Sequence, residues 1–315
     1  MTAPIELSIA FQTNKSPAQY VALGRLVDEL GFDVVSVYND LLFQPALGPL
    51  LFLAQHARTA RLGPAALNPF TLHPVEIAGQ CAVLDAATGG RAYLGLARGS
   101  WLNAIGVHMD RPLTRLRETI EVVRYLLRGD THGYCGDVFS VNSGLMLQYD
   151  VVRTDVPMTL GTWGEKTART VGPLVDEIKI GGSANPAMVR RMLAWLPDKE
   201  VCAGAVTVVD RDRAAARALA RHEVALYLAV VARLDVTLDD PEWVARITSH
   251  GSNYDAISRD ISDAMLDRFA FAGAPADIVR QVEDLRQAGA TRIEFGTPHG
   301  LDAETGIRLI RSALA

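Results

Sequence analysis

Residues 61–98 read RLGPAALNPFTLHPVEIAGQCAVLDAATGGRAYLGLAR, which we interpret as a strand, a helix and a second strand. A parallel strand that is buried on both faces of its sheet reads as a short continuous apolar run. Each predicted strand here ends in irregular polar residues, and active sites of α/β folds gather at the carboxyl ends of parallel strands. The segment therefore indicates a fold class and also where catalytic residues are expected.

The same alternation of strand and helix signals continues along most of the chain. We predict eight strands, at residues 5–11, 34–38, 62–67, 91–96, 157–160, 177–180, 201–209 and 292–295. The first helix begins after Ser16-Pro17 and ends at Gly31, a serine cap and a glycine stop. Eight strands that are each followed by a helix predict a (β/α)₈ TIM barrel, with a doubly wound open sheet as the alternative.

Two segments do not fit this repeat. Residues 131–153 contain Gly133, Gly136 and Gly144 between short apolar runs, so we expect a β-hairpin insertion there. Residues 211–234 form a long helical stretch, and the weakly patterned residues 235–263 lead into a helix at 276–288. Because no low-complexity linker separates any of these parts, we expect a single domain over residues 1–315.

Composition favours a cytoplasmic protein that acts on a small molecule. Hydrophobic residues make up 49% of the 315, charged residues 21%, and the formal net charge is −5. We expect no nucleic-acid partner and no membrane association, since the chain has no basic block and no run of the ~20 apolar residues that a membrane span needs. The N-terminus lacks the pattern of a secretory signal. The three cysteines are widely scattered, which predicts reduced thiols and no metal site.

Five segments in order carry a family resemblance: LGPAALNPFTLHP (62–74), GRAYLGL (90–96), RLRETIE (115–121), GAPAD (273–277) and FGTPHG (295–300). Together they resemble the luciferase-like flavin and deazaflavin oxidoreductases. Within that superfamily the chain is similar to methylenetetrahydromethanopterin reductase and other enzymes that use coenzyme F420. The segments span most of the chain, although residues 210–270 match only loosely. The resemblance implies an oxidoreductase that binds coenzyme F420, with FMN as the alternative cofactor.

The resemblance also implies which strand ends hold the cofactor. A non-prolyl cis peptide between Ala65 and Ala66 would back the ring, although two alanines that fill a crowded core explain the pair equally well. Glycine-rich turns let a backbone approach a flat ring or a phosphate, and the ordinary alternative is a capped turn between strand and helix. The other implied cofactor contacts are Asn39, Asp40, Asn68, Gly99, Ser100, Asn103, Gly161, Thr162, Trp163, Lys179, Gly181 and Gly182.

Two departures from the family pattern bear on the reaction. Leu41 follows Asp40, where deazaflavin-dependent relatives commonly have a histidine that takes a hydroxyl proton. Ser100 stands where relatives often have a glutamate. We therefore expect a reductase that passes hydride from the reduced deazaflavin to a C=C or C=N bond, with Asp40, Arg98 and Ser100 as catalytic residues. An FMN-dependent monooxygenase and a non-catalytic cofactor-binding protein remain the alternatives.

Relatives commonly dimerise through the second and third helices, which implies a homodimer here. These helices carry more apolar residues than one core-facing stripe requires. The apolar residues that these two helices offer, to the core and to a partner together, are Leu50, Leu51, Leu53, Ala54, Val75, Ile77, Ala78 and Val83.

Overall fold

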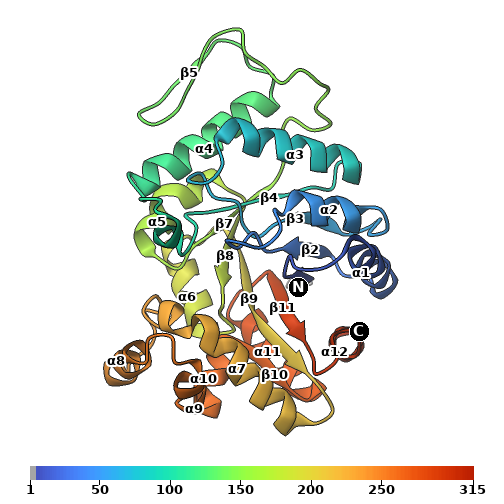
Figure 1. Ribbon diagram of the computed structural model, residues 1–315, viewed down its shortest axis with the longest axis vertical. Coiled ribbons are helices and arrows are strands. Elements are labelled where there is room, and N and C mark those ends of the chain that lie inside the picture. The colour runs from blue at the N-terminus through green and yellow to red at the C-terminus, as the bar shows by residue number, and fades with distance from the viewer. Residues whose placement is uncertain (1–4) are drawn as a thin grey trace. The chain divides into compact units, whose positions relative to one another are not determined.

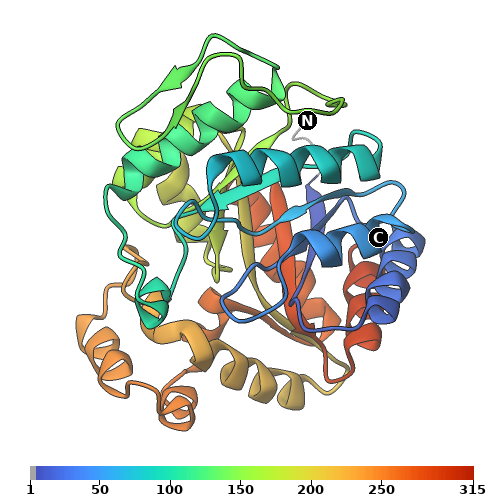
Figure 2. The same ribbon diagram turned by 45° about the horizontal axis from the view of Figure 1, so that its top comes forward.

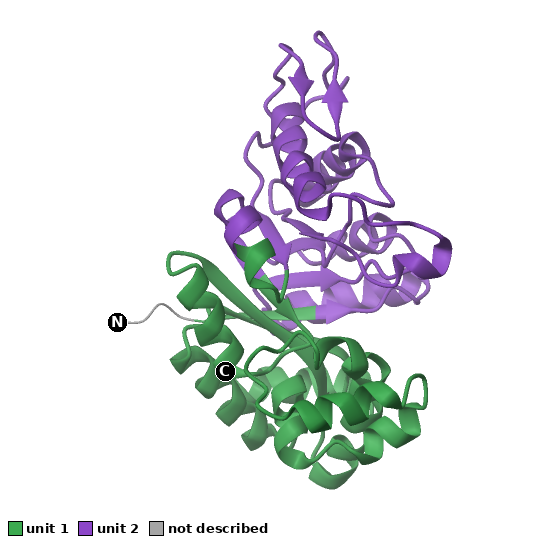
Figure 3. Cartoon of the chain, turned by 90° about the vertical axis from the view of Figure 1, so that its left-hand side faces the viewer, with its two compact units in different colours: residues 1–9, 162–168, 179–315 green, residues 10–161, 169–178 purple. Residues whose placement is uncertain are grey.

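The computed structural model describes residues 5–315, which divide into two compact units. Unit 1 comprises the described residues up to Ile9, then Thr162–Ala168 and Lys179–Ala315; unit 2 comprises Ala10–Gly161 and Arg169–Ile178 (Figure 3). Strands β1 (Glu6–Phe11) and β8 (Glu177–Gly181) and helix α5 (Glu165–Val171) continue from one unit into the other. The single domain expected from the sequence stays a prediction.

Unit 2 alternates strands and helices from its start (Figure 1). Its remaining elements are α1 (Pro17–Leu30), β2 (Val34–Val37), α2 (Leu47–Ala54), β3 (Arg61–Pro64), α3 (Pro74–Thr88), β4 (Leu94–Ala97), the 3₁₀ helix η1 (Leu102–Ile105), α4 (Pro112–Leu127), β5 (Tyr134–Cys135), β6 (Ser140–Val141), β7 (Met158–Gly161) and the 3₁₀ helix η2 (Gly172–Leu174). The predicted limits of α1 are confirmed. Ser16 forms a capping box with Gln19, and Gly31 closes the helix with φ of 66°.

Four strands of unit 2 lie side by side in parallel. Strand β2 pairs with β3, two bridges join the β3 segment to the β4 segment, and β4 pairs with β7. Glycine makes the middle of this array possible, because a Cβ at Gly63 would overlap Tyr93 and one at Gly95 would overlap the carbonyl of Pro64. The carboxyl ends of the four strands therefore meet at one edge.

Unit 1 contains a second set of parallel strands. Its remaining elements are α6 (Pro186–Trp195), β9 (Glu200–Val209), α7 (Arg213–Val231), α8 (Pro241–Ser249), α9 (Tyr254–Arg259), α10 (Asp263–Phe269), β10 (Ala270–Gly273), α11 (Pro275–Gln287), β11 (Arg292–His299) and α12 (Ala303–Ala313). Strand β11 lies between β1 and β9, and β9 is also the neighbour of β8 and β10. The extra helical segment expected after β9 is α7 to α10, and the three short helices pack against α7 (Figure 1).

Several boundaries differ from the sequence-based predictions. Helix α2 is predicted at Pro49–Ala57 but forms at Leu47–Ala54, and its sequence LGPLLFLA offers no polar residue to mark either end. Strand β10 is not predicted, because four apolar residues that directly follow a helix carry no turn signal. Of the eight apolar residues named on the second and third helices, four are buried within unit 2: Leu50, Leu53, Ile77 and Ala78. Helix α2 packs against both α1 and α3, so its apolar excess covers two neighbours.

The predicted hairpin insertion forms and lies along α4 (Figure 2). Its two short strands, β5 and β6, pair antiparallel. The fully buried carboxylate of Glu118 on α4 accepts three backbone N–H bonds from the insertion, from Asp137 at 2.8 Å and from Val138 and Phe139 at 2.9 Å each. Burial alone would raise the pKa of Glu118, but these donors outweigh it, and the pKa lies below its ordinary value.

The far end of the insertion is held by a second buried carboxylate. Arg153 donates from Nε to both oxygens of Asp85 on α3 at 3.1 Å, and from Nη2 to the carbonyl oxygen of Ala92 at 2.7 Å. Asp85 also accepts a bond from the Ala92 amide at 3.1 Å. The two carboxylates thus attach the β5–β6 turn and the last residue of the insertion to neighbouring helices of unit 2.

Across residues 5–315, none of the helices combines the length and the apolar character that crossing a lipid bilayer would demand.

Replacing Glu118 by glutamine should destabilise the fold and flatten its acid response. The amide keeps one acceptor oxygen but turns an N–H₂ group toward backbone donors, a loss we expect to cost about 3 kcal/mol at neutral pH. In the parent, the depressed folded-state pKa gives stability that is present above the unfolded pKa and is lost as pH falls through the folded pKa. Urea denaturation at pH 3 to 7 measures both effects.

Glu304→Gln is the matched control, because this residue pairs with Arg308 on the exposed surface of α12 and its loss should leave stability nearly unchanged. Equal stability of parent and Glu118→Gln at pH 7 would show that the three amide bonds do not anchor the insertion.

Candidate active site

The candidate site in unit 2 lies at the shared carboxyl edge of β2, β3, β4 and β7. Asn39 and Asp40 follow β2, Asn68 follows β3, Arg98 follows β4, and Gly161 ends β7. Because neighbouring parallel strands end at the same edge, these sequence-predicted residues lie on one side of the array. This edge is where a (β/α)₈ barrel places its active site.

Asn68 is the most strongly oriented side chain at this edge. It is buried, and its Oδ1 accepts bonds from the amides of Phe70 at 3.1 Å and Thr71 at 3.0 Å and from the Thr71 hydroxyl at 3.2 Å. These three bonds fix the orientation of the carboxamide, with Oδ1 toward the turn and Nδ2 as the remaining donor. Within residues 5–315 the Nδ2 group donates to no acceptor, so it is available to a ligand.

The backbone just before Asn68 has the conformation implied by the resemblance. The peptide bond between Ala65 and Ala66 is cis, so that prediction is confirmed. Leu67 then returns to the array through a parallel bridge to Leu96. Both alanine side chains are half-buried.

At the end of β2, Asp40 has a partner that sequence reasoning missed. Gln12, the first residue after β1, donates from Nε2 to Oδ2 of Asp40 at 2.9 Å, and its own Oε1 accepts the Thr13 amide at 2.8 Å. A polar residue directly after an apolar strand was the available signal. Asn39 has a structural role, since its Oδ1 accepts the amide of Ala46 at 3.1 Å, just before α2.

The segment after β4 presents exposed and unpaired groups. Arg98 and Ser100 are both exposed, and neither side chain makes a hydrogen bond or ion pair to any residue in the described part of the chain. Between them, Gly99 has φ of 84°, and a Cβ there would lie 3.0 Å from Cγ of Asn68. Asn103 lies in η1 and is also exposed. The structure therefore brings Gly99 against Asn68 and leaves Arg98 available.

Within unit 1, hydrogen bonds hold the predicted residues in place. Trp163 is buried and donates from Nε1 to the carbonyl of Gly181 at 2.8 Å, and the Thr162 amide donates to the carbonyl of Lys179 at 3.0 Å. Gly182, with φ of 80°, donates its amide to Gly204 at 2.6 Å. The turns after β7 and β8 are thus joined to each other within unit 1.

Lys179 differs from the expectation that it holds the cofactor. Its ammonium is bonded to the carboxylate of Glu294 on β11, and both side chains are buried. Nη1 of Arg292 lies 3.5 Å from Oε2 of the same carboxylate. A buried ammonium requires a compensating charge, and Glu294 supplies it for Lys179 within the protein interior. The sequence signal was Glu294 itself, a carboxylate in the middle of an apolar strand.

His73 has a structural role in unit 2. Its imidazole Nδ1 accepts the Val75 amide at 3.3 Å and caps α3. In residues 5–315 no cluster of histidine, cysteine, aspartate and glutamate side chains is arranged to hold a metal ion.

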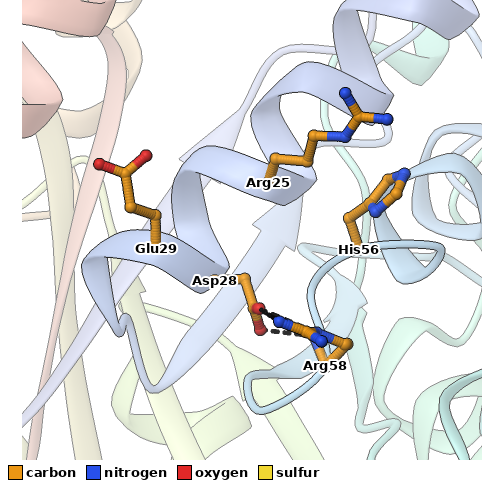
Figure 4. Close-up of a pocket in the computed structure, with 5 residues that line it drawn as sticks. All are labelled: Arg25, Asp28, Glu29, His56 and Arg58. Atoms are coloured by element: carbon orange, nitrogen blue, oxygen red, sulfur yellow. Dashed lines mark hydrogen bonds and ion pairs between the residues drawn. The ribbon is translucent and has the colours of Figure 1, made fainter.

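Unit 2 also has a charged surface pocket, and it does not involve the residues above. Its lining residues are Arg25, Asp28, Glu29, His56 and Arg58 (Figure 4). Asp28 forms an ion pair with Arg58 at 2.8 Å and accepts the Arg58 amide. These residues precede β2 and β3, so the pocket lies by the amino ends of those strands.

The family follows from a comparison with protein-family models. Residues 1–292 match the model described as luciferase-like monooxygenase. The chain belongs to this luciferase-like family. The sequence-based assignment to the superfamily is therefore confirmed.

Relatives of the luciferase-like chain include F420-dependent enzymes. The chain is 28% identical over 306 residues to 5,10-methylenetetrahydromethanopterin reductase of Archaeoglobus fulgidus, covering 91% of each chain. It is 26% identical over 336 residues to F420-dependent glucose-6-phosphate dehydrogenase of Microbacterium testaceum, covering 98% of this chain and 96% of the other.

A solved structure confirms the fold class. The coenzyme F420-dependent tetrahydromethanopterin reductase of Methanopyrus kandleri superposes with a TM-score of 0.88 at 22% identity, over 99% of this chain and 98% of the other. The luciferase-like chain has the predicted (β/α)₈ barrel fold, and the open-sheet alternative is excluded.

Replacing Gly99 by alanine should displace the Asn68 carboxamide. The left-handed backbone costs an alanine about 1–2 kcal/mol, and the new Cβ would also press on the Asn68 side chain. The control is Gly106→Ala, since Gly106 has φ of 72° but a Cβ added there would meet no atom within 4 Å. Thermal denaturation should show a larger loss of stability for Gly99→Ala than for Gly106→Ala. Equal losses of stability would mean that the Asn68 side chain moves aside without cost.

Proposed function

We propose that this protein is a coenzyme F420-dependent reductase, which transfers a hydride to a C=C or C=N bond of a small-molecule substrate. Three points support the proposal: the family, the F420-dependent enzymes among its relatives, and the fold. The observation that carries it is the fixed carboxamide of Asn68, whose free Nδ2 lies at the strand edge beside Gly99.

The unit 2 residues fit a deazaflavin at this edge. Asn68 offers N–H donors of fixed orientation, and Arg98 and Ser100 offer exposed donors, which suit the carbonyl oxygens and anionic groups of such a cofactor. Gly99 lets the backbone approach closely. When bound, the reduced deazaflavin would supply the hydride. The contacts inferred for Thr162, Trp163, Gly181 and Gly182 in unit 1 rest on the family resemblance.

Side chains around Asp40 favour reduction over alcohol oxidation. An alcohol dehydrogenase needs a base for the hydroxyl proton, and the residue after Asp40 is the apolar Leu41. The carboxylate of Asp40 is itself held by Gln12 at 2.9 Å. A reductase instead needs positive charge where negative charge develops on the substrate, and Arg98 is a cation with no protein partner in residues 5–315.

An FMN-dependent monooxygenase is the second candidate, because the matching family model is described by that activity. Such an enzyme must shield a reactive flavin from water, whereas the segment with Arg98 and Ser100 is exposed.

We also propose a cytoplasmic location. The three cysteines are free thiols, which is compatible with a reducing compartment.

Absorption titrations of the purified protein with oxidised coenzyme F420 and with FMN test this function. We expect saturable binding of F420 and bleaching of its reduced form by unsaturated substrates in stopped flow, without oxygen consumption. Preferential binding of FMN with oxygen uptake would establish the monooxygenase instead. Efficient oxidation of a secondary alcohol would contradict the proposed direction.

Arg98→Ala should weaken coenzyme binding or slow hydride transfer by about tenfold, since a guanidinium that pairs with an anionic group of the coenzyme or substrate makes charge-assisted hydrogen bonds worth about 1.5–3 kcal/mol. Arg190→Ala on α6 is the control, because Arg190 is an exposed arginine outside the candidate site. Unchanged binding and unchanged rates in Arg98→Ala would remove Arg98 from the mechanism.

We further propose a homodimer that forms through a surface of unit 2. Beside its buried residues, α3 exposes Val75 and Val83. The insertion adds further exposed apolar side chains, namely Leu145, Met146, Tyr149 and Val152. Exposed apolar residues on neighbouring segments are typical of an interface between subunits.

Light scattering at micromolar concentration should give the mass of a dimer, and Val83→Glu should shift the protein toward a monomer by placing a charge in the interface. Val279→Glu on α11 is the matched control, since both valines are 42% exposed. A monomer mass for the parent would refute the dimer.

A further inference from the structure

Arg115 on α4 connects two segments that are distant in sequence. Its Cζ lies over the Phe70 ring at 5.0 Å from the centroid and over the Phe139 ring at 5.1 Å, so the guanidinium contacts both aromatic rings. Phe70 belongs to the site loop, which we define as residues 68–71. Phe139 belongs to the insertion, residues 131–153, and is buried.

Few hydrogen bonds hold this guanidinium, so the rings dominate its position. Nη1 donates to the carbonyl of Pro69 at 3.4 Å. The buried Nε of Arg115 has no acceptor among residues 5–315. A cation between two ring faces is attracted by both quadrupoles, and the attraction strengthens when water is excluded. Loss of either ring should therefore free Arg115.

One of the residues that Arg115 contacts, Phe70, also helps to orient Asn68. Pro69 and Phe70 directly follow Asn68, and the Phe70 amide is one of the donors to its Oδ1, at 3.1 Å. Movement of Phe70 would therefore loosen the bonds that fix the carboxamide. On its other side, Phe139 contacts His73 edge-on, with 5.2 Å between ring centroids, and donates its amide to Glu118.

Other contacts hold the insertion on α4 without reaching the site loop. Tyr134 donates its hydroxyl to Glu121 at 2.5 Å, and the Gly133 amide donates to the Tyr125 hydroxyl at 2.9 Å. These bonds and those to Glu118 fix the insertion itself. Only the pair of Arg115 and Phe139 also touches residues 69 and 70, among the contacts described for α4 and the insertion.

We propose that Arg115 is a positioning residue, through which the insertion sets the orientation of the Asn68 carboxamide for coenzyme binding. Phe139 of the insertion contacts the guanidinium, and so do Phe70 and Pro69 of the site loop. The coenzyme part of this inference rests on the proposed F420-dependent function. The mechanical part concerns only contacts within unit 2.

Phe139→Leu tests the inference with two readouts. It keeps an apolar side chain but removes the ring over Arg115, so hydrogen exchange of the Phe70 and Thr71 amides should quicken by about fivefold. Coenzyme F420 should bind more weakly by a similar factor. The matched control is Tyr134→Phe, which removes a bond between the insertion and α4 and should leave both readouts within about twofold of the parent.

The possible outcomes separate the two layers of the inference. Parental exchange rates in Phe139→Leu, or equal acceleration in Tyr134→Phe, would overturn the positioning role. Faster exchange with unchanged F420 affinity would also overturn it, because Asn68 would then not serve the coenzyme. A parent that binds no F420 contradicts the proposed function, while the exchange rates still decide the mechanical part.

A second variant, Arg115→Lys, keeps the inference testable if Phe139→Leu fails to fold. Arg115→Lys keeps the charge but loses the planar guanidinium that lies over the Phe70 and Phe139 rings. It should quicken the same two amides as Phe139→Leu does. Parental exchange in this variant would overturn the proposal on its own.

Discussion

Strands β3 and β4 approach so closely that side chains larger than hydrogen do not fit at Gly63 and Gly95. The two segments stay side by side as far as the bridge between Leu67 and Leu96, and just beyond it Asn68 lies against Gly99. The contact matters for function because Asn68 is buried with its oxygen already satisfied by the following turn. A tight backbone packing thus determines which donor group remains for a ligand.

Much of this arrangement could be predicted from the sequence, because local rules govern it. The strands are apolar runs, Ser16 and Gly31 limit the first helix, and the Ala65–Ala66 bond follows the family pattern. Helix α2 shifted because its sequence is apolar on every side. Strand β10 was not predicted because it depends on pairing with β9, a tertiary contact that a run of four residues does not reveal.

Partners of charged and polar side chains were the least predictable part of the site. Lys179 has the position expected of a cofactor ligand, yet Glu294, more than a hundred residues later, takes its charge. Gln12 could be found beside Asp40 only once β1 and β2 were known to end together. Sequence patterns identify which strand ends carry polar groups, whereas long-range contacts decide which of these groups are left for chemistry.

The insertion has a consequence for how relatives of this chain can diverge. It is anchored at two points, by Glu118 at the β5–β6 turn, residues 137–139, and by Asp85 at Arg153. When the ends of a loop are fixed, doubling its length costs only about 0.6 kcal/mol in closure entropy. A change in the length of residues 142–152, between the two anchors, therefore costs little closure entropy, which makes this stretch a natural module for new specificity outside the barrel strands.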